Sequence, residues 1–390
     1  MKSMNVLSNY LIPIFLTISL ILYYYLIPFT TADVGNYYIP WYNYIIEHGS
    51  ARLIVDQFAN YTPPYLYLLI FGSLFRDVVD PLTIVKIISI AGTFFLASSI
   101  YFLLTALTDR SRATIGGLLA LFLPTVVLNG PASAQSDAIY TGFCLFGIFS
   151  VIRGRPAWAM ACFGFAISFK LQAALLAPFV LYLLVTRRVT VTDCLIGLAA
   201  AIGIMVPAWI AGSSPVASYM IYFGQSQFFH KLSMNAPNMW YILQSKFNFP
   251  FRKGVYLGLA AGISATVLIP LLALRNRKPT DLDLLLVAFT SVLCLPYVLP
   301  KMHDRYFFMA DILSLALAIA APSWRTIACA VLIQYASFIA CCQFVFKIYD
   351  AAKMGVLPMS IASLITLYMF LSRMVFTAPV FTKAGTARGV

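Results

Sequence analysis

The sequence predicts an all-α protein that crosses a membrane many times. Of its 390 residues, 61% are hydrophobic and only 10% are charged. The mean hydropathy is +0.87, a value that excludes an ordinary soluble domain. The apolar residues form long runs separated by short loops rich in Lys and Arg, and such loops are typical of the cytoplasmic side of a membrane protein.

About twelve transmembrane helices are expected, with both ends of the chain inside and additional outer-face juxtamembrane helices. The expected spans are 7–29, 82–107, 113–129, 137–152, two short runs within 156–186, 193–211, 254–273, 281–299 and three later helices. They form one membrane domain over residues 1–378, followed by a flexible cytoplasmic tail at 379–390. The two large outer loops are 30–81 and 212–253.

The net charge of +13 does not indicate a nucleic-acid partner, because the basic residues are scattered between apolar runs instead of forming one patch. The seven cysteines also lie within apolar runs, without the spacing of metal ligands, so they are expected to pack as small hydrophobic residues. No metal site and no cofactor are expected.

The first outer loop is the longest polar stretch near the start of the chain. Wound as a helix from Asp33 to Glu47, it places Val34, Tyr37, Tyr38, Trp41 and Ile45 on one face and Asp33, Asn36, Asn43 and Glu47 on the other. Asp33 can cap this helix, Pro40 predicts a kink and Gly49 predicts its end. The run Pro63–Phe75 is only about 20 Å long as a helix, so a second short surface or re-entrant helix is expected there.

Four polar clusters remain once seven aspartates at helix ends (Asp77, Asp80, Asp109, Asp193, Asp281, Asp283 and Asp350) are assigned to solvated caps. The clusters are Asp33 with Asp56, Gln135-Ser136-Asp137, Lys170 with Gln172, and His303-Asp304-Arg305. The predicted topology puts all four on the outer face. Each has a structural alternative: a helix cap, a snorkelling lysine or an interfacial anchor. Lys170 has no acidic residue near it in sequence, which makes a buried position unfavourable.

Together, these residues suit transfer of a sugar from a lipid phosphate. Such a reaction needs a general base for the acceptor hydroxyl and positive donors for the leaving phosphate. Asp33 is the expected base, with Asp56 as the alternative, and Lys170, His303 and Arg305 are the expected phosphate ligands. A nucleotide-diphosphate donor usually needs a metal held by paired carboxylates, and the outer loops contain no Asp-x-Asp pair.

Aromatic residues of the outer loops are expected to enclose the sugar and the prenyl chain, although they also fit an ordinary interfacial aromatic belt. These are Tyr37, Trp41, Tyr61, Tyr65, Trp240 and Tyr241. The full expected substrate-binding set is Asn36, Trp41, Asp56, Tyr61, Gln135, Asp137, Gln172, Asn238 and Trp240.

The order of these motifs resembles the bacterial GT-C glycosyltransferases related to the GPI-anchor mannosyltransferases. The motifs are Asp33, Pro40-Trp41, Gly49, the run from Asn60-Tyr61-Thr62 to Tyr67, Gln135-Ser136-Asp137, Lys170-x-Gln172, Asn235-x-Pro237-Asn238 and Lys301–Phe307. The resemblance covers about residues 10–320. It implies a polyprenyl-phosphate sugar donor, a catalytic aspartate in the first outer loop, which Asp33 matches, and inversion at the anomeric carbon. Asp304 stands where the family more commonly has glutamate, and it is assigned no role.

The resemblance therefore predicts an inverting transferase of a hexose, mannose-like, to a glycan or glycolipid acceptor at the outer face of the plasma membrane. A lipid-linked sugar flippase or polysaccharide polymerase is the nearest alternative, because both handle polyprenyl substrates. A secondary transporter is the remaining one, but the two halves of the chain show no relation to each other.

Overall fold

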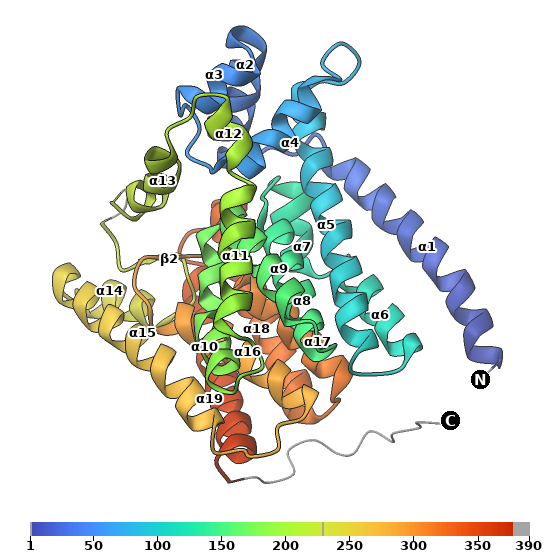
Figure 1. Cartoon of the computed structure of the whole chain (residues 1–390), viewed down its shortest axis with the longest axis vertical. Coiled ribbons are helices and arrows are strands. Elements are labelled where there is room, and N and C mark those ends of the chain that lie inside the picture. The colour runs from blue at the N-terminus through green and yellow to red at the C-terminus, as the bar shows by residue number, and fades with distance from the viewer. Residues whose placement is uncertain (1, 228–229, 377–390) are drawn as a thin grey trace. The chain divides into compact units, whose positions relative to one another are not determined.

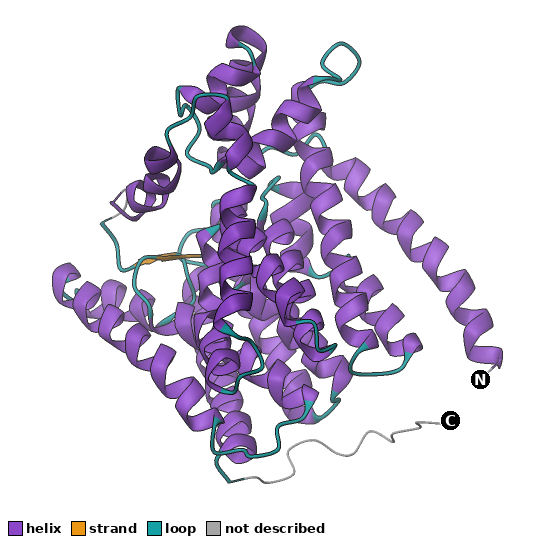
Figure 2. Ribbon diagram, viewed as in Figure 1, coloured by secondary structure: helices purple, strands orange, loops and turns teal. Residues whose placement is uncertain are grey.

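The computed structural model describes residues 2–227 and 230–376, and these are predominantly helical (Figures 1 and 2). Within these residues, the β-structure is a single pair of two-residue strands, β1 (Ser233–Met234) and β2 (Met302–His303), which run parallel. The predicted tail at 379–390 lies outside the described residues. The all-α fold class is confirmed.

Five described helices are long and apolar enough to cross a membrane. They are α5 (Pro81–Thr105), α15 (Phe251–Ala273), α16 (Asp281–Val298), α18 (Trp324–Val345) and α19 (Ala352–Met374). A sixth span is possible where α6 (Arg110–Ala120) is followed, after a 47° bend, by 124–132. The structure therefore supports a polytopic membrane protein.

The predicted count of twelve spans is not confirmed. Helices occur at the other expected positions, but their apolar parts are only 10–17 residues long. At 1.5 Å per residue such helices measure about 15–26 Å, less than the roughly 30 Å hydrocarbon core. The helices concerned are α1 (Lys2–Leu26, apolar from Leu11), α8 (Asp137–Ile152), α9 (Pro156–Phe169), η3 with α10 (Leu171–Leu176 and Ala177–Val185), α11 (Val191–Gly203) and α17 (Phe308–Ala320).

The chain divides into two compact units. Unit 1 comprises Met1–Phe102, Gly117–Ala174 and Val189–His230, and unit 2 comprises Leu103–Gly116, Leu175–Arg188 and Lys231–Val390. Nothing in this division tests the prediction of one membrane domain over 1–378, which stays a prediction.

Unit 1 is built on α8, α9 and α11, which pack side by side (Figure 1). A Cβ atom at Gly164 of α9 would collide with the carbonyl oxygen of Gly197 of α11, so glycine allows these backbones to touch. Residues 30–81 add the short helices η1 (Val34–Tyr38), α2 (Ile39–His48), α3 (Ser50–Val55) and α4 (Pro63–Ser73). Residues 206–227 add α12 (Val206–Ile210) and α13 (Pro215–Gln227).

The predicted helix at Asp33–Glu47 is present, but its first part, η1, is π-helical. Val34, Tyr38, Trp41 and Ile45 are buried, as expected. Tyr37 is 39% exposed instead, because a π-turn holds more residues than an α-turn and rotates this side chain off the buried face. Gly49 ends α2, as predicted, with a backbone φ of 87°.

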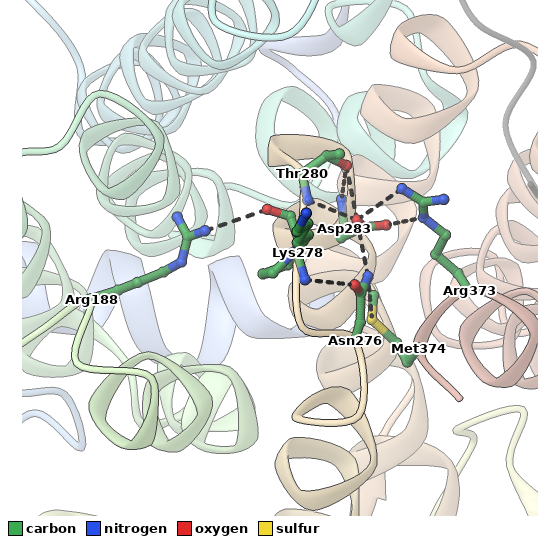
Figure 3. Close-up of polar contacts among 8 residues, drawn as sticks. Arg188, Asn276, Lys278, Thr280, Asp283, Arg373 and Met374 are labelled. Carbon is green, nitrogen blue, oxygen red and sulfur yellow. Dashed lines mark hydrogen bonds and ion pairs between the residues drawn. The ribbon is translucent and has the colours of Figure 1, made fainter. Parts of the chain in front are cut away.

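Unit 2 is built on α15 to α19, with α10 against α15 and α14 (Met239–Phe247) against α19. Thr280 and Asp283 form a capping box that starts α16. Arg373 of α19 donates from Nε and Nη2 to the two Asp283 carboxylate oxygens, at 2.6 and 3.1 Å (Figure 3). The expected cap at Asp283 is present, but it is not solvated: this side chain has no exposed surface and its charge is balanced inside the unit.

Candidate functional site

Asp33 stands just before η1, in the segment that follows α1. Its side chain makes no capping hydrogen bond, so the predicted N-cap role was wrong: the backbone at Asp33 is already helical, with φ −66° and ψ −38°. Its Oδ2 accepts a 2.6 Å hydrogen bond from Gln135 Nε2 instead. Asp33 is thereby connected to a residue 102 positions later.

Gln135 is held from its other side by Tyr38. The Tyr38 hydroxyl donates to Gln135 Oε1 at 3.0 Å and lies 3.2 Å from the Tyr61 hydroxyl. Tyr38 and Gln135 are each only 2% exposed. Because both ends of its amide are engaged, Gln135 has one orientation, and the Asp33 carboxylate is oriented with it.

A second network lies next to the first in sequence. Lys170 Nζ donates to Asp137 Oδ1 at 2.8 Å, and Asn129 Nδ2 donates to Asp137 Oδ2, also at 2.8 Å. The side chains of Asp137 and Lys170 are 0% and 9% exposed. The buried lysine therefore has an acidic partner, which the linear sequence does not reveal.

The segment 129–137, called the strap below, carries the polar side chains of both networks. It begins in the π-helical turn η2 (Leu128–Ala132), which continues α7 (Pro124–Val127), and it ends at the first residue of α8. Gln135 N donates to Asn129 O at 3.0 Å, and Ala134 adopts φ +55°, so the strap closes into a tight turn. Every residue of the strap is buried.

Aromatic rings pack beside the first network. Trp41 lies with its ring centroid 5.3 Å from that of Tyr38 and 5.2 Å from that of Tyr61. Lys170 Nζ lies 5.6 Å from the centre of the Tyr61 ring, within reach of a cation–π interaction. Trp41 is only 3% exposed, whereas Tyr61 is half-buried. Direct sugar contact by either ring stays a prediction.

Asp56 lies apart from these networks. Its carboxylate accepts a 2.7 Å hydrogen bond from the Tyr44 hydroxyl, and Arg52 lies 3.4 Å away. The hydrogen bond from Tyr44, assisted by Arg52, lowers the pKa of Asp56. A lowered pKa makes Asp56 a weaker general base than an ordinary aspartate. Neither Asn36 nor Gln172 joins either network in the described part of the chain.

In unit 2, the structure brings together two of the sequence motifs. Strand β1 pairs with β2 so that Met234 lies opposite His303, and Asn235 bridges to His303 as well. Asn238 Nδ2 donates to Pro296 O at 3.1 Å, and Trp240 Nε1 donates to Val298 O at 2.7 Å.

Asn238 and Trp240 are 0% and 2% exposed, so both side chains support the segment that leads to His303. His303 and Arg305 are half-buried. The predicted substrate contacts of Asn238 and Trp240 and the predicted phosphate contacts of Lys170, His303 and Arg305 stay predictions. In the part of the chain that the structure describes, no group of three or more His, Cys, Asp or Glu side chains could hold a metal ion.

Residues 53–186 match the family model of the alpha-(1→6)-mannopyranosyltransferase N-terminal domain. This match, over about a third of the chain, supports a GT-C mannosyltransferase-like membrane protein. It is a glycosyltransferase, and as such it uses a sugar donor and an acceptor. No curated protein matches the chain.

The strap, Tyr61 and Lys170 lie within the matched mannosyltransferase segment, whereas Asp33 and His303 lie outside it. Sequence reasoning missed two members of the networks. The helical pattern puts Tyr38 on an apolar face, which predicts no polar role for it, and Asn129 is the last residue of an expected span. A signal was present for Asn129, because a polar side chain at membrane depth usually has a partner.

Proposed function

We propose that the protein moves a mannose-like hexose from a polyprenyl-phosphate donor to a glycan or glycolipid acceptor at the outer face of the plasma membrane, with inversion. Asp33 is the general base. It takes the proton of the acceptor hydroxyl while that oxygen bonds to the anomeric carbon. The bond between this carbon and the phosphate oxygen breaks, and the electron pair leaves with the polyprenyl phosphate.

The observation that carries this proposal is the hydrogen bond from Gln135 to Asp33. A catalytic base must be oriented toward the proton it removes. Gln135 orients the Asp33 carboxylate, and Gln135 is itself fixed by the hydrogen bond from Tyr38. A carboxylate has about four acceptor positions, so the bond from Gln135 leaves capacity for the acceptor hydroxyl. Asp56, the alternative base, has a lowered pKa and is tied to Tyr44.

Replacement of Asp33 by asparagine tests the proposal in purified protein supplied with a polyprenyl-phosphate mannose donor. Asp33→Asn keeps the shape of the side chain and removes its basicity, so turnover should fall by about 10²–10⁴-fold with donor binding retained. Asp77→Asn is the matched control, because the Asp77 side chain is 88% exposed and outside both networks. Near-normal turnover of Asp33→Asn would remove Asp33 from the mechanism.

Two product measurements test the rest. Nuclear magnetic resonance of the product shows whether the anomeric configuration is opposite to that of the donor, and retention would contradict direct displacement. Mass spectrometry of lipid-linked glycans with and without the gene identifies the missing sugar. A glycan unchanged by loss of the gene would contradict the proposed acceptor class.

A further inference from the structure

A buried lysine inside α5 belongs to neither hydrogen-bond network. Lys86 lies near the start of this span candidate and has no exposed surface. A charged side chain within a membrane helix is unfavourable, and where it persists it usually has a specific role. Lys86 makes two hydrogen bonds to the strap.

The Lys86 ammonium donates to the carbonyl oxygens of Pro131, at 2.9 Å, and Ala132. These carbonyls end the π-helical turn η2, where helix carbonyls lack partners within the helix. One turn further along α5, the single O–H of Ser89 is shared between Gly130 O, at 3.0 Å, and the carbonyl oxygen of Lys86, at 2.9 Å. Three consecutive strap carbonyls are therefore held by one face of α5.

The contact between α5 and the strap is close. A Cβ atom at Gly130 would collide with Thr93 Oγ1 of α5, so a larger residue at this point of the strap would require the Thr93 side chain to move. An ammonium group suits this place, because it carries three donors on a flexible apolar stem and can satisfy two carbonyls at once.

In the sequence, the strap carbonyls held by Lys86 lie between one residue of the second network and one residue of the first. Asn129 precedes them and contacts Asp137, and Gln135 comes after them and contacts Asp33. A shift of residues 130–132 would therefore move Gln135 relative to Asp33. A misplacement of about 1 Å caused by a distant mutation can lower a rate by about 100-fold.

We propose that Lys86 is a positioning residue: by holding the carbonyls of the strap it sets the hydrogen bond from Gln135 to the Asp33 base. The inference rests on the proposed function of Asp33. Lys86 touches no substrate in this proposal and acts only through the strap.

The test is a double-mutant cycle in the purified enzyme. Lys86→Met should lower kcat by about 100-fold, while KM for the polyprenyl-phosphate donor changes less than about threefold. Gln135→Ala should have a similar effect, and the double variant should be little worse than the worse single variant, because both changes disrupt the same bond. Lys253→Met, at an exposed lysine of the span candidate α15, is the matched control and should keep normal kinetics.

Two results would overturn the proposal. One is an unchanged kcat in Lys86→Met, and the other is a double variant whose fold loss in kcat equals the product of the two single losses. If Lys86→Met does not fold, Lys86→Leu takes its place in the cycle, because it also removes every N–H donor to the carbonyls. The same two criteria then apply to it.

A second measurement separates this inference from the assignment of Asp33. Hydrogen exchange of peptides covering the strap should become about tenfold faster in Lys86→Met, with peptides of α15 unchanged. Unchanged exchange in the strap would refute the role of Lys86 even if Asp33 is the base. Faster exchange together with normal turnover of Asp33→Asn would instead refute the base and leave the hold on the strap intact.

Discussion

Removal of the charge on Asp137 should destabilise the protein strongly, because it leaves Lys170 buried without its acidic partner. The two groups are 2.8 Å apart. At an effective dielectric constant of about 20, their attraction is about 6 kcal/mol, most of which offsets the unfavourable transfer of two charges from water. Breaking such a pair on one side typically costs about 3–5 kcal/mol. We expect this loss for Asp137→Asn and a similar one for Lys170→Met.

The variant that carries both changes should recover much of that loss, since neither buried charge then remains. The measurement is equilibrium unfolding of the four proteins in mixed detergent micelles, monitored by tryptophan fluorescence. Asp109→Asn breaks an exposed pair with Arg112 at 3.4 Å and is the control, with an expected change below about 1 kcal/mol. If the double variant loses the sum of the two single losses within about 0.5 kcal/mol, the two residues are independent and the reasoning is wrong.

Two further predictions concern acidic residues away from the strap. Asp56 should titrate below the usual range of an aspartate, because the hydrogen bond from Tyr44 lowers its pKa. The contribution of this hydrogen bond to stability is present above the ordinary aspartate pKa and is lost as pH falls through the lowered value. A nuclear magnetic resonance titration of the labelled carboxyl checks this, and an ordinary pKa would contradict it. Asp283→Asn should lower the unfolding free energy by about 3 kcal/mol, since Arg373 loses its buried partner; unfolding in micelles measures the change, and a loss below about 1 kcal/mol would show that the pair is screened.

The helix positions were largely predictable from the sequence because they depend on local patterns. The expected span 137–152 coincides with α8, and the expected 281–299 differs from α16 by one residue. Apolar run length, flanking basic residues and capping signals are all short-range properties. The number of complete spans was less predictable, because it depends on helix lengths that fall near the membrane thickness.

The members of the site were mostly predictable, but their pairings were not. The scarcity of polar groups in an apolar chain singles out Asp33, Gln135, Asp137 and Lys170. The partner of Lys170 lies 33 residues earlier, and that of Asp33 lies 102 residues later, so packing alone brings them together. The polar role of Tyr38 was hidden because a tyrosine on an apolar helix face is indistinguishable from a core residue until its hydroxyl meets an acceptor.

The two π-helical turns make the site sensitive to chain length as well as to side-chain identity. A π-turn is equivalent to an α-helix with one extra residue, and η1 and η2 contain Tyr38 and Asn129, respectively. Deleting one residue from η1 would restore a regular α-helix and rotate the chain before the turn by about 100° relative to the chain after it. The apolar pattern of the loop would survive, but the Tyr38 hydroxyl and the Asp33 carboxylate could no longer face the same glutamine. Among relatives of this chain, insertions and deletions within 34–38 and 128–132 should therefore be rarer than in the neighbouring turns.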